Sequence, residues 1–416
     1  MSHWLLEKLS DTRQQALKQA NRAQIYHELL DAPFGEDAEL IRRSAEALEM
    51  VVLDLVLESI TDDEEKLSEL KLSAADAFRL LRVLPRPEGV MDTAMFLLRA
   101  STLAVLGDKG SDAARWLREK PWPELPLESN DWSERTWATI LDIWLRLIRK
   151  SGWTDRDTVL ERIASLRESQ ASFEKDYLEG QAPAHAKAAA LELIGLYHLA
   201  KSAEVFAHYI TDGVVDGKYQ IHQLLETHFC RVLAACAQAQ MVELEPLSRL
   251  LAAGASQMAD NSIWTVTRAV NSRVTEFVKN LVDRGRGDRA IFDVLPPQRR
   301  ALAERGLLGS SRRAVVVSLP TSSGKTLIAQ FRILQALNQF EHERGWVVYL
   351  APTRTLVNQI ARQLRRDFEP LDIIVEQVSP ALEVDNIESE LLHQNDPEQE
   401  FRVLITTPEK LDLMLR

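Results

Sequence analysis

The feature that most constrains the fold of this chain is the segment Val315-Val-Val-Ser-Leu-Pro-Thr-Ser-Ser-Gly-Lys-Thr326. An apolar β-branched run, a turn of small residues and the helical apolar pattern that starts at Leu327 predict a strand, a loop and a helix. Small loop residues let successive backbone N–H groups point at phosphate oxygens, and the positive end of the helix adds to their attraction. The segment therefore predicts a phosphate-binding site.

The ligand expected at this site is ATP with Mg²⁺. The Lys325 ammonium is expected to reach the β- and γ-phosphates, and the Thr326 hydroxyl is expected to ligate the metal ion. Leu319 stands where the general pattern G-x-x-x-x-G-K-[ST] has its first glycine, so a chance loop of similar composition is the alternative. The loop residues expected to surround the phosphates are Thr321, Ser322, Ser323 and Gly324.

Two later segments repeat the order of apolar strand, polar loop and helix. One runs from Trp346 to Gln359 and the other from Arg402 to Asp412, and each strand ends in Thr and Pro residues. Such repetition predicts a parallel α/β sheet whose loops open at one edge. The adjacent parallel strands expected in this sheet are Val315–Val317, Val347–Leu350 and Val403–Ile405.

Together these segments resemble motifs I, Ia and Ib of superfamily 2 helicases, at Pro320–Thr326, Ala351–Leu356 and Thr407–Lys410. DEAD-box members usually carry Gly where this chain has Ser322, and the Thr-Pro-Glu-Lys sequence at motif Ib is similar to the Ski-type and archaeal Hel-type branch. The resemblance implies an RecA-like lobe that binds ATP and loops that grip a nucleic-acid strand.

The resemblance also assigns expected roles to individual residues. Thr353, Arg354 and Thr407 are expected to contact the phosphates of a single-stranded or partly duplex nucleic acid, without reading the bases. DNA and RNA remain open alternatives, because no motif here addresses the 2′-hydroxyl. Gln298 lies in a segment similar to the adenine-recognition segment of these enzymes, since an amide can match the adenine edge. An exposed glutamine at a helix start is the alternative.

The first 280 or so residues have a helical pattern throughout, so the expected architecture is a large all-α array followed by a truncated RecA-like parallel α/β domain. The expected domains are residues 1–285 and 286–416, with Arg284–Arg289 as the hinge. A helix with a buried apolar face is expected over Trp137–Ile148, capped by Asp131 with Glu134 and stopped near Gly152. His222, His228, Cys230 and Cys236 match no common zinc spacing, and His228 and Cys236 fall on an apolar stripe while Cys230 does not, so core packing is expected instead of a metal site.

Charge and composition restrict the class of protein. The net charge is −12 in 416 residues, yet residues 291–372 hold 12 Lys and Arg against 7 Asp and Glu, a net charge of +5. Residues 373–400 hold eight acidic residues and no Lys or Arg, which indicates a solvated acidic connection. Two cysteines, no long apolar run and no signal pattern lead us to expect a cytoplasmic protein without a membrane segment.

The function expected from these features is that of an ATP-dependent helicase or translocase whose helical region docks a protein partner or regulates the motor. The family resemblance suggests a helicase subunit of a bacterial antiviral defence system. No Asp-Glu-x-His or Asp-Glu-x-Asp segment follows Lys410, so the chain is expected to be the N-terminal portion of a larger helicase, inactive alone. A helical interaction scaffold with an incomplete nucleotide site is the alternative, and a metabolic P-loop enzyme is disfavoured by the second and third segments.

Overall fold

The computed structural model describes most of the chain as two compact units. The first contains residues 1–262 and 285–293, and the second contains residues 263–284 and 294–416. The described residues are 3–26, 37–58, 63–180, 185–216, 220–242, 244–267, 270–283, 290–309, 314–320, 323–340, 346–378 and 401–416, with the backbone alone at 169–174, 176–178, 401 and 402.

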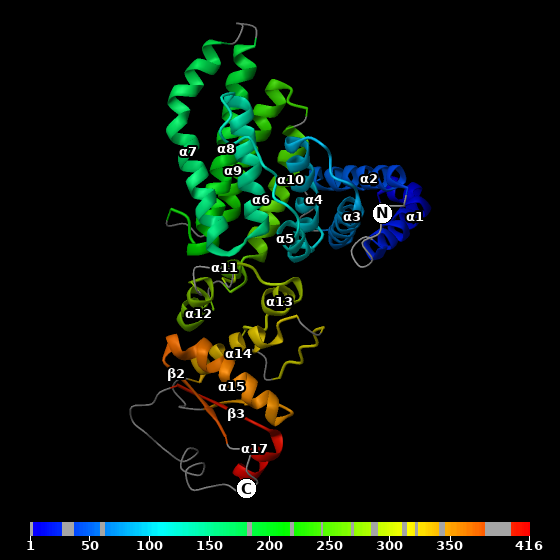
Figure 1. Cartoon of the computed structure of the whole chain (residues 1–416). Helices are drawn as coiled ribbons and strands as arrows, with labels where there is room; N and C mark the ends of the chain where they lie inside the picture. Colours follow the sequence, from blue (N-terminus) through cyan, green and yellow to red (C-terminus); the bar gives the residue numbers. More distant parts are fainter. Residues whose placement is uncertain are drawn as a thin grey trace. The chain divides into compact units, whose positions relative to one another are not determined.

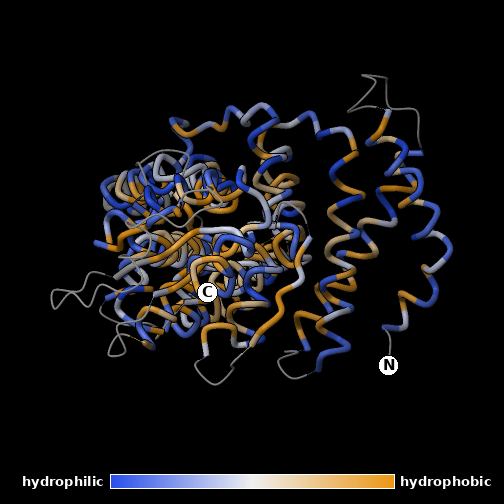
Figure 2. Tube along the Cα trace, turned by 90° about the horizontal axis from the view of Figure 1, so that it is seen from below, coloured by the Kyte–Doolittle hydropathy of each residue, from blue (hydrophilic) through white to orange (hydrophobic). Residues whose placement is uncertain are grey.

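The first unit is an array of helices (Figure 1). Sequential helices contact one another, and α4 also packs against α6 and α10, which are distant in sequence. Figure 2 shows hydrophobic and hydrophilic residues alternating along the helical tubes, as expected for helices that bury one face. The helices are α1 (Trp4–Gln24), α2 (Ala38–Leu57), α3 (Glu64–Val83), α4 (Val90–Leu106), α5 (Gly110–Glu119), α6 (Trp132–Arg149), α7 (Gly152–Glu179), α8 (Ala186–Asp212), α9 (Ile221–Ala239) and α10 (Leu244–Asn261).

Helix α6 begins and ends where its sequence predicts. The Asp131 side chain caps the helix by accepting a hydrogen bond from the Glu134 backbone N–H at 2.9 Å. Lys150 adopts the left-handed conformation, with φ of 45°, and ends the helix. The predicted apolar face is buried around Trp144, whereas Trp137 is only half-buried and donates to Glu192.

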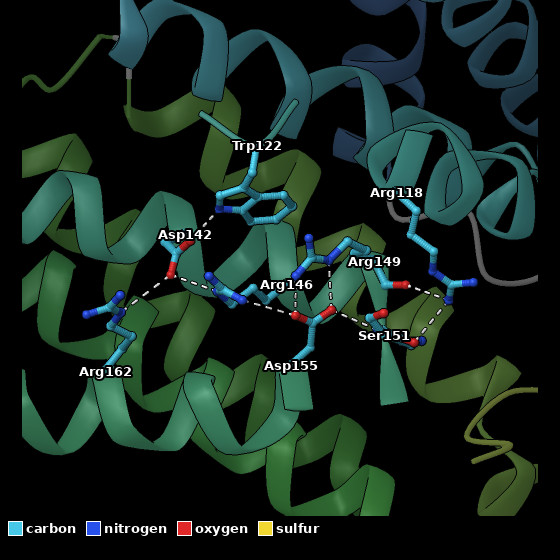
Figure 3. A network of polar contacts seen from close by, with 9 residues as sticks. Arg118, Trp122, Asp142, Arg146, Arg149, Ser151, Asp155 and Arg162 are labelled. Carbon is cyan, nitrogen blue, oxygen red and sulfur yellow. Dashed lines mark hydrogen bonds and ion pairs between the residues drawn. The ribbon is translucent and has the colours of Figure 1, made fainter. Parts of the chain in front are cut away.

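A buried polar network holds α6 and α7 together (Figure 3). Asp155 accepts hydrogen bonds from Arg146 Nη1 at 3.2 Å, from Arg149 Nε at 2.9 Å and from the Ser151 backbone N–H at 2.7 Å. Arg146 also donates to Asp142, which is almost fully buried. Buried carboxylates stabilise a fold only when they are paired, and here each has arginine partners.

The second unit contains a three-stranded parallel sheet in the order β1-β3-β2. Val347 pairs with Val403 and Ile373 pairs with Phe401. The central strand is fully buried at Val403, as expected for a parallel sheet covered by helices. The predicted combination of a helical array and a partial RecA-like domain is therefore confirmed. The strands and longer helices are β1 (Val347–Leu350), β2 (Ile373–Gln377), β3 (Phe401–Thr406), α12 (Ser272–Asp283), α14 (Lys325–Gln339), α15 (Arg354–Phe368) and α17 (Pro408–Leu415).

Two local predictions about this sheet were wrong. Val315–Val317 forms no strand in the structure, and Val316 is 95% exposed. The described strands offer this segment no partner, and an apolar run without one cannot satisfy its backbone groups as a strand. Conversely, Ile373–Gln377 is strand β2 and not the start of an acidic connection. The prediction rested on the acidic charge of residues 373–400 as a whole and did not consider the β-branched residues at its start. Positions 379–400 lie outside the described residues.

Helix α12 packs within the second unit. The ring of Phe277 lies 5.5 Å from that of Phe331 on α14 and 5.6 Å from that of Phe368 on α15, edge to face in both cases. The chain therefore passes between the two units more than once, because residues 263–284 belong to the second unit and residues 285–293 belong to the first. The expected hinge at Arg284–Arg289 lies outside the described residues, and the two-domain boundary at residue 285 stays a prediction.

Candidate nucleotide and nucleic-acid site

The candidate phosphate loop ends at the first residue of α14. Gly324 precedes this helix with φ of 70°, a conformation that glycine adopts without steric cost. Ser323 is buried, and its hydroxyl donates to the Pro320 carbonyl at 2.6 Å, which closes the turn. Lys325 is exposed and Thr326 is half-buried in the first helical turn. Thr321 and Ser322 lie outside the described residues.

Gln298 lies directly against this loop. Its side chain is 3% exposed, and its Nε2 donates to the Gly324 carbonyl at 3.2 Å. Its Oε1 accepts from the Leu295 backbone N–H at 2.8 Å. A Cβ added to Gly324 would overlap Gln298 Nε2, so a side chain at position 324 would displace the end of the glutamine. The structure thus brings the predicted adenine-recognition residue to the predicted phosphate loop, with one amide proton and one carbonyl lone pair left over.

The two loops that are candidates for binding a nucleic-acid strand follow the neighbouring β-strands β1 and β3. Thr353 follows β1 and caps α15, where its hydroxyl accepts from the Leu356 backbone N–H at 3.3 Å. Thr407 follows β3 and caps α17, where its hydroxyl accepts from the Lys410 backbone N–H at 3.4 Å. Because β1 and β3 are adjacent and parallel, both loops lie at the same edge of the sheet. Arg354, in the first turn of α15, is exposed.

These loops share one electrostatic property. Lys325, Arg354 and Thr407 each stand at or beside the start of a helix, where unpaired backbone N–H groups and the helix dipole favour anions. No hydrogen bond or ion pair of the Lys325 ammonium occurs within the described part of the chain. The starts of these three helices of the second unit are each suited to binding phosphate oxygens.

The His and Cys residues of α9 do not form a recognisable metal site. Cys236 is buried, and burial raises the pKa of its thiol to about 11, whereas Cys230 is exposed. His222 Nε2 lies 2.9 Å from Asp260 Oδ1, and His228 Nδ1 lies 3.1 Å from His198 Nδ1. Among the residues that the structure describes, no three His, Cys, Asp or Glu side chains are arranged to hold a metal ion.

A buried polar contact between α14 and α15 was not predicted from the sequence. Gln330 Nε2 donates to Asp367 Oδ2 at 2.6 Å, and both side chains are 2% exposed. A signal was present, because Asp367 follows Leu364 at helical spacing on an otherwise apolar face. A polar residue on such a face has to find a buried partner.

Comparison with known proteins supports the resemblance of this part of the chain. Residues 296–416 match the family described as DEAD/DEAH box helicase. The ATP-dependent DNA helicase Hel308 of Pyrococcus abyssi is 32% identical over 143 residues, which cover 34% of this chain and 17% of the relative. The Hachiman protein HamB of Bacillus cereus is 28% identical over 168 residues, covering 40% of this chain and 14% of the relative.

A third relative is the activating signal cointegrator 1 complex subunit 3 of Mus musculus, 30% identical over 108 residues, which cover 24% of this chain and 4% of the relative. The chain thus spans less than a fifth of the length of each of these relatives. No helix within the described residues has the length and apolar character needed to cross a membrane. Residues 296–416 carry a DEAD/DEAH box helicase match, and the chain's resemblance to superfamily 2 helicases of the Hel-type and Ski-type branch is confirmed.

Proposed function

We propose that the protein is an ATP-dependent superfamily 2 helicase or translocase that acts on single-stranded or partly duplex nucleic acid. The observation that carries this proposal is the contact between Gln298 and Gly324 beside the exposed Lys325. A residue type suited to the adenine edge and a cation suited to phosphates thus flank one loop. The match of residues 296–416 to the helicase family supports the same function.

In the proposed nucleotide site the backbone of Ser323 and Gly324 binds phosphate oxygens, together with Thr321 and Ser322. The Lys325 ammonium neutralises charge on the β- and γ-phosphates, which a neighbouring hydroxyl cannot do. The Thr326 hydroxyl is the oxygen ligand that this loop offers to Mg²⁺, a cation that prefers oxygen. Mg²⁺, when bound with ATP, supplies positive charge at the phosphates.

In the proposed nucleic-acid site, Thr353, Arg354 and Thr407 bind phosphates of the nucleic-acid backbone. Hydroxyl groups, a guanidinium and free N–H groups at a helix start suit phosphate oxygens and carry no information about the bases. Binding independent of sequence follows. We propose DNA as the first substrate to test, because the Hel308 relative is named a DNA helicase.

We further propose that the first unit, the helical array, docks a protein partner or regulates ATP-driven activity of the second unit. The protein is also proposed to work in the cytoplasm. A place in a bacterial antiviral defence system is proposed on family resemblance alone. Residues 1–416 by themselves are expected to hydrolyse no ATP, because the sequence after Lys410 holds no acidic pair to align the attacking water.

The test is strand-stimulated phosphate release by the whole protein, compared with its Lys325→Ala variant. Loss of turnover in the variant, with the circular dichroism of the helical unit unchanged, is the expected result. Equal turnover by both proteins would refute the assignment of Lys325. Absence of turnover in the unaltered protein, with partner binding retained, would favour the interaction scaffold.

A further inference from the structure

A buried polar contact joins α14, which begins at the proposed nucleotide site, to α15, which begins at the proposed nucleic-acid site. Gln330 of α14 donates through Nε2 to Asp367 Oδ2 of α15 at 2.6 Å, and Arg366 Nε donates to the other oxygen, Oδ1, at 3.1 Å. The next residues in sequence, Phe331 and Phe368, are fully buried and both contact the ring of Phe277. The contact therefore lies within the apolar packing of α12, α14 and α15.

A polar pair is an unusual choice if its role is only to hold α14 and α15 together. Burying a carboxylate is unfavourable unless hydrogen bonds satisfy it, and an apolar pair of similar volume would hold two helices at least as well. A hydrogen bond differs from apolar contact in being directional, because it weakens steeply with distance and misalignment. The Gln330–Asp367 bond consequently adds a directional restraint on where α14 lies along α15.

The bond links the second turn of α14 to the last turn of α15. Helix α14 begins at Lys325 and α15 begins at Arg354, so a shift of either helix changes the place of its own loop. We propose that Gln330 and Asp367 are positioning residues that couple nucleotide binding at Lys325 to strand binding at Arg354. This inference rests on the proposed function, since it takes both ligands as given.

Coupling is measured as the factor by which nucleotide changes the affinity for a strand. The probes are a fluorescein-labelled oligothymidylate, followed by anisotropy, and the non-hydrolysable analogue AMP-PNP with Mg²⁺, added to the whole protein. Couplings between sites typically lie at about 5- to 150-fold, and Gln330→Leu is expected to reduce the factor to below about twofold. The affinity for each probe alone is expected to stay within about twofold of the unaltered protein, because neither residue touches a ligand in the proposed sites.

Two further variants separate positioning from simple stability. The double variant Gln330→Leu with Asp367→Leu replaces the polar pair by apolar side chains and is expected to fold while its coupling stays lost. Gln335→Leu is the matched control, since Gln335 is also a buried glutamine of α14 but donates to the Leu308 carbonyl and not to α15. This control is expected to lower the unfolding temperature and to keep the coupling.

The possible results have distinct meanings. Coupling that persists in Gln330→Leu, or that returns in the double Leu variant, overturns the inference whatever happens to the unfolding temperature. An unaltered protein that binds both probes without coupling also overturns it and leaves the proposed function standing. An unaltered protein that binds neither probe overturns the proposed function and this inference with it.

Discussion

Gln298 and Gly324 hold each other in place although they are 26 positions apart in the chain. Gln298 Nε2 donates to the Gly324 carbonyl at 3.2 Å, and the same nitrogen occupies the space that a side chain at position 324 would need. Gly324 also has φ of 70°. A larger residue at position 324 would thus be strained by the backbone conformation and would also displace the end of the glutamine.

The first prediction separates these two requirements with a pair of substitutions. Gly306 has a similar φ of 61° but nothing lies near its absent side chain, so Gly306→Ala introduces strain alone. Such strain costs about 1–2 kcal/mol of unfolding free energy. Gly324→Ala is expected to cost more and to weaken nucleotide binding, because Gln298 is displaced. Urea unfolding and titration with a fluorescent ATP analogue check both; equal effects of the two substitutions would contradict the role of the contact.

A second prediction concerns Arg354 in the proposed nucleic-acid site. Arg354→Ala is expected to weaken binding of single strands of every sequence alike and to lower the salt dependence by about one phosphate contact. The control is Arg362→Ala, which removes an exposed arginine of the same helix away from the loop. Anisotropy titrations at several salt concentrations measure both effects. A loss confined to particular base sequences would show that Arg354 reads bases instead.

The parts of the second unit that could be predicted from the sequence are those determined by local pattern. The β-branched runs at Val347–Leu350 and Val403–Ile405 form two of the predicted strands, and each is followed by the predicted polar loop and helix. The predicted strand at Val315–Val317 failed because strand formation also requires a partner, which no local pattern specifies. The contact between Gln298 and Gly324 was not predicted; family resemblance only assigned the two residues to one nucleotide site.

A third prediction tests the buried network of the helical unit. Asp155→Ala removes the shared partner of Arg146 and Arg149 and leaves two largely buried guanidinium groups without it. Breaking a buried charge pair costs about 3–5 kcal/mol of unfolding free energy. Asp157→Ala, which removes a half-exposed partner of Arg156, is expected to cost at most about 1 kcal/mol. Denaturant unfolding followed by circular dichroism compares the two, and similar costs would contradict the structural role of the network.

A fourth prediction concerns acid sensitivity of the same unit. Burial lowers the pKa of His198, and nearby Arg231 lowers it further; burial likewise lowers the pKa of His228, helped by His198, Lys201 and Arg231 against an opposing effect of Glu204. The folded state therefore favours the neutral imidazoles. Their stabilising contribution is complete above the unfolded histidine pKa of about 6.5 and is lost as the pH falls below that value.

His222 provides the contrast within the same unit. Its hydrogen bond to Asp260 raises its pKa, so its contribution is complete below the unfolded pKa and is lost as the pH rises through the folded pKa. His228→Gln is expected to reduce the loss of stability between about pH 7 and about pH 5, and His222→Gln to increase it. Unfolding temperatures measured across that range decide the matter; identical profiles for both variants would show that these pKa shifts do not control stability.

Other features of the second unit could not be predicted from the sequence, because they depend on contacts between distant segments. Asp367 stands out as a polar residue on an apolar face, but no pattern in the sequence identifies Gln330 as its partner, and only their packing shows that they share one hydrogen bond. The placement of α12 against Phe331 and Phe368 likewise depends on contacts between distant segments. Periodicity identifies the buried face of each helix, but it does not identify the partner that covers the face.

Nucleotide binding at Lys325 is tested most directly by titrating residues 1–416 with a fluorescent ATP analogue and Mg²⁺. Saturable binding is expected, weakened at least about tenfold by Lys325→Ala, which corresponds to about 1.4 kcal/mol. Lys279→Ala, which removes an exposed lysine from α12, is the control and should leave the affinity unchanged. Equal affinity of the unaltered chain and Lys325→Ala would contradict the assignment of the phosphate loop.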